Sequence, residues 1–583
     1  MLNSKLYDLR DKRDRKKLGE ICQDPSIQKV FHSITSDIYA LSTIDILVKP
    51  PYHCTLIAAS LVNENFASLK LKQMAKDILG EECSEAKELS KVKARLKREA
   101  KKRGEIFNYE MIPAEILYPY AKKDPEYTMK IWFYFMDKLG DYIDLYNFEL
   151  SLVPIIVKMR QNGIFVDRKF CRRKLRELGA KRDKCYNEIL GYLREHRIRV
   201  KTKKLKGGEY ESYNPASSKQ VQQVISQLNL PINKLTAKGD LATDITALQA
   251  HKDHPLIHNQ LLCRFYDKQC GTYYGPLYRR YTSIDNPVVH FSFYQSGART
   301  GRFSAELIQT IPKMKEDVVV KEAREVRRAF IAPEGYIIML ADYNQIEMRL
   351  FIHYARCESM AEQVLAGYDP HMGTAYDIFG RKVVDKLDEK GRKQFRDAMK
   401  DTNFGIIFGM GANKLMSQLS SHDLPTNRNP YEILEDYYRK YPVREFMQKA
   451  IGDLYRKGVV TISFDSPLMR FSRDFHVPQH LAYKAVNVII QSSAAYVMKY
   501  GMKRCIKAIA RYKLGAKLFM TVHDELGFYI KDDDRKDETI EILKNKMEDH
   551  VTFDLPMTVS IKVSETNWGD AKEYKPQLSV RRK

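Results

Sequence analysis

The chain has 583 residues, 44 % of them hydrophobic, and a formal net charge of +24. This composition excludes a disordered chain, and the length predicts several domains with buried cores. No apolar run approaches the ~18 residues that span a bilayer, so no membrane partner is expected. The charged segment 1–17 predicts no signal peptide. The nine cysteines include no Cys-x-x-Cys pair, so neither a disulfide framework nor a zinc site is expected.

The positive charge favours a polyanionic partner, because each phosphate that a protein neutralises releases counterions. A lysine-rich surface that only faces water is the alternative. The segment 91–103, KVKARLKREAKKR, poses the same choice locally. Its residues favour a helix, which predicts either a solvated helix face or loop, or a patch that faces nucleic acid.

Helical patterns dominate the region that follows the mixed pattern of residues 1–137. Apolar spacing predicts a long helix from about residue 138 to Gly163, in which Pro154 marks a kink or an early turn. The basic segment 194–212 contains a pair of glycines and predicts an exposed tip between two helices. A further helix is expected to begin after it, with Ser217 or the next serine as its cap.

Strand patterns return in the second half of the chain. The region 285–357 predicts strands at 288–295 and 335–344 followed by one helix, and 360–450 is mostly helical. One long helix is expected at 487–509. Helices that interrupt a sheet in this way favour an α+β fold with a helical insertion. The later strands are expected at 459–464, 517–525, 526–530 and 556–563.

Two aspartates each end an apolar, strand-like run, Asp342 in IIMLAD and Asp524 in FMTVHD. A single aspartate in such a place is usually a turn or cap residue. Two of them suggest carboxylates at the edge of a buried sheet, and Mg²⁺ prefers hard oxygen ligands of this kind. A pair of metal ions ~3.5–4 Å apart needs such bridging carboxylates.

A basic and aromatic stripe lies between the two aspartates. Arg396, Lys400, Phe404 and Phe408 are spaced by four, so they share one face of a helix. The cations can hold phosphates, and a ring can stack on a base or a sugar. An amphipathic helix with its phenylalanines in a core is the alternative. Together with the aspartates, the stripe predicts template-directed nucleotidyl transfer with two Mg²⁺ ions, for which Mn²⁺ could substitute.

These segments resemble the motifs of family A DNA polymerases, the family of bacterial polymerase I and of phage replicases. DYNQIEMRL (342–350) is similar to motif A, RDAMKDTNFGIIFG (396–409) to motif B, and VHDE (522–525) to motif C. The segments 298–312 and 485–495 also resemble family segments. The resemblance covers essentially the whole chain. It implies a cytoplasmic enzyme, or one in the host cytoplasm if a phage encodes it.

The resemblance implies a right-hand polymerase of palm, fingers and thumb, preceded by a partial RNase H-like exonuclease domain. The expected boundaries are 1–137 for the exonuclease-like domain, 138–284 for the thumb, 285–357 for the first part of the palm, 358–475 for the fingers and 476–583 for the second part of the palm.

The resemblance also assigns roles to matching positions. Asp342 and Asp524 would bind both metals, assisted by the carbonyl of Tyr343, with Glu525 beside them as a further catalytic residue. Lys400 would stabilise the leaving pyrophosphate, and it is a candidate acid. The nucleotide-binding set would be Arg396, Lys400, Phe404, Phe408, Glu347 as the steric gate against a 2′-hydroxyl, Gln345, His371 and Tyr343. The residues that contact primer or template would be Arg302, Gln309, Asn487, Gln491 and His523.

Several positions depart from the family pattern. Phe408 replaces a tyrosine whose hydroxyl lies near the gate glutamate, so the strength of the gate is in question. Tyr483 stands where an arginine is common, and Ser492 and Tyr496 replace a glycine and an aspartate. Because these positions are not metal ligands, we expect catalytic activity to be retained and the binding of DNA to differ.

The N-terminal region resembles a 3′–5′ exonuclease domain in two of its three motifs. The segment 30–41 supplies Asp37, and the segment 120–128 supplies Tyr120 and Asp124. No strand-borne Asp-x-Glu is found before Asp37, and Cys54 stands in place of a usual aspartate. We therefore expect no proofreading from this chain alone. Either a separate polypeptide completes the site, or the domain is a relic that supports the polymerase.

The expected partners are primer–template DNA and dNTPs, and further candidates are a separate exonuclease fragment and a processivity factor. A single-subunit RNA polymerase is disfavoured, because it would not be expected to carry Glu347 and Phe404. A catalytically inactive DNA-binding relative would be expected to lose the metal carboxylates, and both aspartates are intact.

Overall fold

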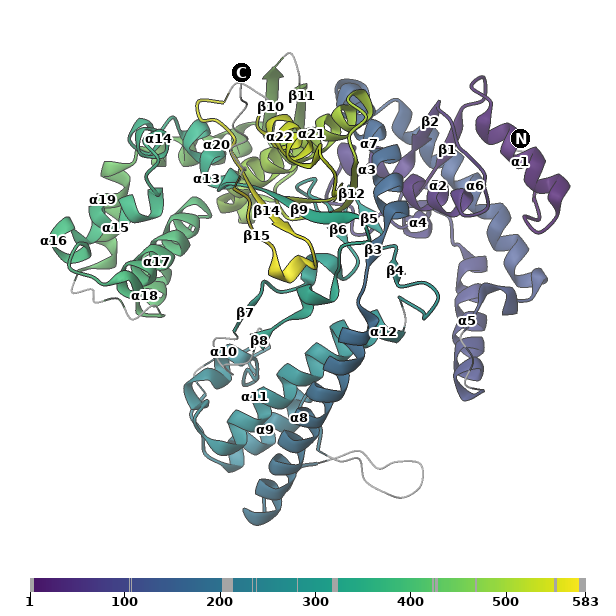
Figure 1. The fold of residues 1–583 in the computed structure, drawn as a ribbon. Helices are drawn as coiled ribbons and strands as arrows, with labels where there is room; N and C mark the ends of the chain where they lie inside the picture. The colour runs from purple at the N-terminus through teal and green to yellow at the C-terminus, as the bar shows by residue number, and fades with distance from the viewer. Residues whose placement is uncertain are drawn as a thin grey trace.

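The computed structural model has a central sheet with helical groups on three sides (Figure 1). Residues 346–440 form the group at the left of the figure, residues 168–279 the group that extends downward, and residues 12–136 the group at the right. The structure describes residues 5–575 except 104, 106, 202–212, 233, 237, 280, 317–322, 422–423, 425–427, 467–468 and 550–552.

The central sheet consists of β9 (Tyr336–Tyr343), β12 (Ala516–Val522), β13 (Glu525–Lys531), β14 (Val559–Ser564) and β15 (Lys572–Glu573). The strand order is β12–β13–β9–β14–β15, and every neighbouring pair is antiparallel. β9 is the middle strand, and its run from Ile337 to Ala341 is buried. A continuous apolar run is what a strand covered on both faces requires. The strands predicted at the two aspartates are therefore confirmed.

Long helices cover this sheet. α21 (Ala485–Arg511), the predicted long helix, packs against α13 (Ile346–Ala355) and α22 (Lys536–Glu548). α22 also contacts β13 and β14, and α7 (Ile143–Asn162) lies against β12. α7 ends at Asn162 with Gly163 as its cap, as predicted, but it continues through the exposed Pro154 without an early turn.

The left-hand group corresponds to the expected fingers. Its long helix is α17 (Glu389–Ile407), which packs against α15 (Pro370–Phe379). The side chain of Asp388 caps α17, and that of Asp369 caps α15. The remaining helices of this part are α14 (Glu358–Leu365), α16 (Arg381–Val384), α18 (Ala412–Ser421), α19 (Pro430–Lys440) and α20 (Arg444–Lys457).

A β-hairpin follows these helices. It is formed by β10 (Val460–Ser466) and β11 (Met469–Phe475), which pair along their whole length. β10 packs against α20 and α21, and β11 packs against α7. The hairpin therefore joins the base of the fingers to the helices that cover the central sheet.

The downward group corresponds to the expected thumb. Its helices are α8 (Arg168–Glu195), α9 (Ser218–Gln227), α10 (Ile245–Leu248), α11 (Pro255–Lys268) and α12 (Gly275–Arg279). α8 and α11 pack side by side, and Ser217 caps α9 as predicted. The predicted basic tip at 194–212 lies outside the described residues from residue 202 onward.

The right-hand group is the expected exonuclease-like region. It contains a two-stranded parallel sheet of β1 (Lys29–Phe31) and β2 (Tyr52–Cys54). α6 packs against α3, α4 and α5. The helices of this region are α1 (Lys12–Gln23), α2 (Ile34–Ser42), α3 (Thr55–Val62), α4 (Leu71–Leu79), α5 (Ser84–Lys102) and α6 (Ala114–Met136).

The strand predicted at 288–295 is wrong as a single element. β4 (Val288–Val289) pairs with β3 (Ile164–Phe165), whereas β5 (Phe293–Tyr294) pairs with β6 (Ser304–Ala305). Between them, a ring nitrogen of His290 contacts the carbonyl of Arg160 at 2.8 Å. The segment changes partner after two residues, which no alternation of apolar residues could indicate. A third short pair is β7 (Lys315–Glu316) with β8 (Ala323–Arg324).

Candidate active site

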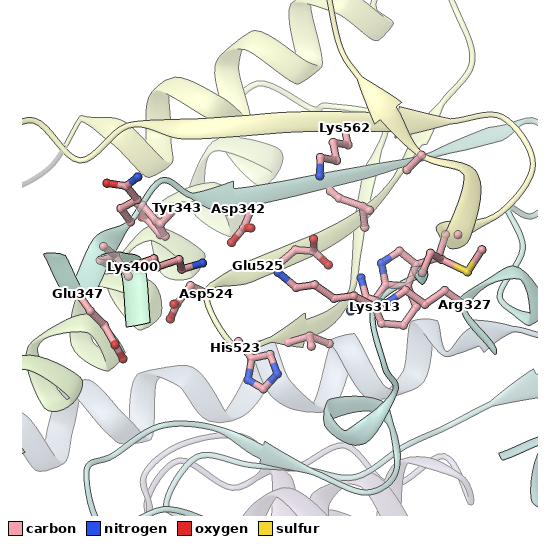
Figure 2. Close-up of a pocket in the computed structure, with 18 of the residues that line it drawn as sticks. Lys313, Arg327, Asp342, Tyr343, Glu347, Lys400, His523, Asp524, Glu525 and Lys562 are labelled. Carbon is pink, nitrogen blue, oxygen red and sulfur yellow. The ribbon is translucent and has the colours of Figure 1, made fainter. Parts of the chain in front are cut away.

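The two predicted metal-binding aspartates line one cavity of about 500 Å³ at the end of the central sheet (Figure 2). Asp342 is the penultimate residue of β9, and it pairs directly with Glu525, the first residue of β13. Asp524 lies in the two-residue turn between β12 and β13, and its carbonyl accepts the N–H of Tyr343 at 3.1 Å. A tight turn between two buried strands leaves Asp524 little freedom to move.

The surroundings of the carboxyl groups in this cavity disfavour their ionised forms. Burial raises the pKa of Asp342, raises that of Asp524 to about 6 and raises that of Glu525 to about 7. The negative charge of Asp342 contributes to the shifts of both its neighbours. The ionised cluster is therefore stabilised by any cation that enters the cavity.

The donor set fits divalent magnesium. The carboxylates of Asp342 and Asp524 and the carbonyl of Tyr343 are hard oxygen donors, and Mg²⁺ is usually held by one or two carboxylates together with water and substrate phosphates. Across the described residues, no three carboxylate, imidazole or thiol groups converge as a complete ligand set. The donors therefore suit ions that share their coordination with a substrate.

Three cations that the sequence analysis did not identify also line the cavity. Figure 2 shows Lys562 entering the cavity from β14, and Lys313 and Arg327 lying on the side of Glu525. All three lie close enough to favour the charged form of Asp342. The sequence offered no signal for Lys562, because it falls on the polar face of the alternating strand VSIKVS like an ordinary exposed lysine.

The basic stripe lies across the cavity from the carboxylates. Arg396, Lys400 and Phe404 of α17 line it, and Figure 2 shows the ammonium group of Lys400 directed toward Asp342 and Asp524. The spacing by four thus aims one face of α17 at the sheet. Nε of Arg396, however, donates to Oδ2 of Asp369 at 2.7 Å.

Two residues predicted to contact the nucleotide, His371 and Phe408, do not line the cavity. His371 is fully buried, and its Nδ1 accepts a hydrogen bond from the amide of Asn403 at 3.0 Å. Burial lowers the pKa of His371 to about 4, so the ring is neutral. Its ring centroid is 5.9 Å from that of Phe404, and the ring of Phe404 is stacked with that of Phe408 at 6.1 Å. The roles of His371 and Phe408 at the nucleotide stay predictions.

The predicted steric gate is in an ion pair. Nη2 of Arg302 contacts Oε1 of Glu347, and it lies 3.9 Å from Oδ1 of Asp524. One guanidinium therefore contacts the predicted gate and approaches a carboxylate that is predicted to bind metal. Gln345, at the N-terminus of α13 with a φ of 50°, also lines the cavity.

The other predicted DNA contacts are more dispersed. His523 adopts a φ of 53° in the turn before Asp524, and it lines the cavity. The amide of Gln309 donates to the carbonyl of Phe303 at 2.8 Å. Asn487 and Gln491 lie on α21 outside the residues that line the cavity, and their contacts with DNA remain predictions.

The exonuclease-like region brings its three predicted residues together. Tyr120 and Asp124 lie one turn apart on α6, and the charge of Asp124 reaches Asp37 on α2. Burial, with a smaller contribution from Asp124, raises the pKa of Asp37 to about 6. Cys54 is buried nearby, and its thiol donates to the carbonyl of His32 at 3.2 Å.

A lysine side chain lies beside Asp124 and Tyr120. Nζ of Lys72 lies 2.7 Å from Oδ1 of Asp124 and 2.8 Å from Oε1 of Glu85. It also lies 4.4 Å from the ring centroid of Tyr120 and 4.5 Å from that of Tyr127. The ammonium group of Lys72 therefore compensates the negative charge of Asp124.

Fold and site together define a right-hand polymerase preceded by an exonuclease-like domain. The family model for DNA polymerase family A matches residues 189–570, so the chain belongs to this family. A second model, for a 3′–5′ exonuclease, matches residues 5–140. The resemblance found in the sequence is confirmed for both regions.

Known relatives carry the same assignment. The chain is 25 % identical to DNA polymerase I of Pseudomonas aeruginosa over 569 residues, which cover 95 % of this chain and 58 % of that protein. It is 30 % identical to the thermostable DNA polymerase I of Thermus aquaticus over 381 residues, which cover 62 % of this chain and 42 % of that protein. The chain thus spans about half the length of the curated relatives it matches.

A solved structure shares the fold. The POL domain of Pol1 from M. smegmatis, in complex with a DNA primer-template and dNTP, superimposes with a TM-score of 0.74 at 22 % identity. The match covers 96 % of this chain and 89 % of that one. Within the described residues, no helix combines the length and the apolar character needed to cross a membrane.

Proposed function

We propose that this chain is a DNA-directed DNA polymerase that extends a primer 3′-hydroxyl with dNTPs and releases pyrophosphate, in the service of DNA replication. The observation that carries the proposal is one cavity in which Asp342 and Asp524 face Lys400 and Arg396. Carboxylates on one wall and cations on the other suit the transfer of a nucleotidyl group from a triphosphate. Membership of family A supports the same reaction.

The carboxylates of Asp342 and Asp524 and the carbonyl of Tyr343 would hold two Mg²⁺ ions. When bound, such ions supply charge stabilisation and a more acidic primer hydroxyl. The protein's part is to fix these oxygens at the end of β9 and in the turn before β13. Glu525 would add negative charge beside them without serving as a required ligand.

The helix α17 would position the triphosphate. Lys400 is directed toward the carboxylates, so its ammonium group suits the leaving pyrophosphate and could give it a proton. Arg396 would need to leave Asp369 in order to reach phosphate. A competing phosphate is a good partner for guanidinium, which accords with closure of α17 on the correct dNTP.

Glu347 would discriminate between dNTPs and rNTPs, because its side chain lines the cavity and would exclude a 2′-hydroxyl. Arg302 neutralises it and holds it in place. The same guanidinium would contact the primer end, so entry of DNA would redistribute this charge between Glu347 and the primer.

We further propose that this chain alone does not proofread. No strand-borne Asp-x-Glu precedes Asp37, Cys54 replaces a usual aspartate, and Lys72 already neutralises Asp124. The second candidate is a nuclease completed by a separate polypeptide, which the proximity of Asp37 and Asp124 favours.

Primer extension tests these assignments. The chain is given Mg²⁺ and matched or 3′-mismatched primer–template, with dNTPs, with rNTPs and without nucleotide. We expect extension with dNTPs only and no shortening of the mismatched primer. Binding without extension would overturn the polymerase assignment. Shortening in the absence of nucleotide would overturn the assignment of a chain that cannot proofread.

A further inference from the structure

The helix α5 stands apart from the core of the exonuclease-like region. It packs against α6, but only Leu89 and Ala100 among its residues are buried. Figure 1 shows α5 extending from the body in the same direction as α8 and α11 of the thumb. Burial of apolar surface therefore accounts for little of its length.

One face of α5 is a stripe of cations. With ~100° of rotation per residue, six of its basic residues fall within about a third of the circumference, on the side opposite Leu89. All of them are exposed to solvent. The residues of this cationic stripe are Lys87, Lys91, Arg95, Arg98, Lys101 and Lys102.

The charges of the cationic stripe are largely uncompensated. Within the described chain, its one ion pair is that of Arg95 with Glu99 at 4.0 Å. Lys87 and Lys91 are one turn apart, as are Arg98 and Lys102, and each such like-charge pair costs a helix ~0.2–0.5 kcal/mol. The stripe therefore opposes folding of the free protein, and a polyanion would reverse that effect.

A groove continues the stripe toward the body. It has a volume of about 580 Å³ and lies between α4 and α5. Lys72, Lys76, Lys87 and Lys91 line it, together with Ser90. Lys72 is held by two carboxylates, whereas Lys76 and Lys87 have no ion pair within the part of the chain that the structure describes. The groove thus offers ammonium groups and a hydroxyl to phosphate oxygens.

We propose that the cationic stripe of α5 binds the sugar–phosphate backbone of the duplex part of the primer–template. The inference rests on the proposed polymerase function. A straight helix of 19 residues, ~28 Å long, suits a rigid duplex. The cationic stripe contains no aromatic residue, and the nearby rings of Phe107 and Tyr109 lie against Lys97 and Lys93, outside the stripe. Binding of single strands depends on aromatic rings for stacking, so the stripe itself suits a duplex better. The thumb would hold the duplex from one side and α5 from another.

Removal of charge from α5 tests the proposal. Glutamine is chosen because its helix propensity is close to that of lysine and arginine. The control lowers the net charge equally at exposed lysines on α20, near the C-terminal end of α21 and in the turn that follows α21. The test variant carries K87Q, K91Q, R98Q and K102Q, and the control variant carries K449Q, K457Q, K507Q and K513Q.

Affinity is measured by fluorescence anisotropy over a salt series, on primer–templates with duplexes of about 10 and about 30 base pairs and on a single strand. The test variant should bind the long duplex about fivefold or more weakly, and the slope of log K against log salt should fall by about 2–4. The short duplex and the control variant should show little change.

Two results would overturn the proposal. One is a test variant that matches the control in affinity and salt slope on the long duplex. The other is equal weakening on the single strand, which would assign α5 to unpaired DNA. Extension of saturating primer–template by the unaltered chain is read separately, so failure of the proposed polymerase function remains distinguishable. Circular dichroism of both variants checks that α5 stays folded.

Discussion

Asp342 and Glu525 lie directly opposite each other where β9 pairs with β13. Side chains in this relationship have Cβ atoms ~4.5–5.5 Å apart, and like charges there oppose folding. Lys313, Arg327 and Lys562 offset this repulsion in part. The free protein therefore carries electrostatic strain at the site where bound cations would relieve it.

Glu525→Gln should stabilise the free protein at neutral and higher pH. The pKa of Glu525 is raised from 4.5 to about 7, so its stabilising contribution is complete below about pH 4 and is lost as the pH rises through 7. At pH 8 the free energy of unfolding of the variant should exceed that of the parent by about 1–3 kcal/mol, because its amide carries no buried charge. The difference should shrink toward pH 4. Urea unfolding without divalent metal measures it, and a pH-independent difference would contradict the prediction.

Asp524→Ala should abolish primer extension while leaving primer–template binding largely intact. In the proposed mechanism the carboxylate would hold metal, whereas DNA would be held by many phosphate contacts spread over the protein. The matched control is Asp534→Ala, an exposed acid in the turn after β13. Single-turnover extension and anisotropy separate the two properties. Residual extension combined with weak binding would remove Asp524 from the catalytic residues.

Glu347→Ala and Glu347→Gln should separate the size of the gate from its charge. Alanine removes the side chain that would collide with a 2′-hydroxyl, so the efficiency of rNTP incorporation should rise about tenfold or more. Glutamine keeps the size and loses the ion pair with Arg302. It should retain most of the discrimination. The ratio of kcat/KM for dNTP and rNTP measures both, and equal relaxation in the two variants would show that charge, rather than size, excludes the ribose.

Sequence patterns predicted the parts of this site that follow from one element at a time. The apolar runs before Asp342 and Asp524 indicated strands, and spacing by four indicated the face of α17. The cations Lys313 and Lys562 were missed, because their proximity to Asp342 depends on how distant segments pack. No local pattern encodes such a contact.

The single strand predicted at 288–295 was wrong for a similar reason, because its pairing also depends on distant segments. Its apolar alternation is real, but the segment exchanges one partner strand for another after Val289. The ion pairs of Arg302 and Arg396 were equally beyond reach, since both arginines were assigned to ligands from the resemblance and the free protein gives them carboxylates instead.

Lys499→Met should be strongly destabilising. Lys499 and Glu149 are both buried, with Nζ and Oε1 2.5 Å apart, and they join α21 to α7. Removal of one partner leaves a buried unpaired charge, which costs about 3–5 kcal/mol. The double variant with Glu149→Leu should recover much of that loss. A double-mutant cycle by urea unfolding measures the coupling, and additive losses would show that the two charges do not depend on each other.

Lys72→Met should destabilise the exonuclease-like region without creating a nuclease. Lys72 compensates Asp124 and Glu85, which are half-buried, so its loss leaves two neighbouring carboxylates without a cation. We expect a loss of about 1–3 kcal/mol. Lys76→Met is the matched control, because it lies one turn along α4, is exposed and has no ion pair among the described residues.

Two measurements distinguish a structural lysine from one that blocks a metal site. Urea unfolding should show the loss in Lys72→Met alone, and neither variant should shorten a mismatched primer in Mg²⁺. Asp37 and Asp124 remain in the variant, but Cys54 adds no hard oxygen donor beside them. Shortening by Lys72→Met and not by the parent would mean that Lys72 suppresses a competent nuclease, in which case the domain would be a regulated proofreading site rather than a support for the polymerase.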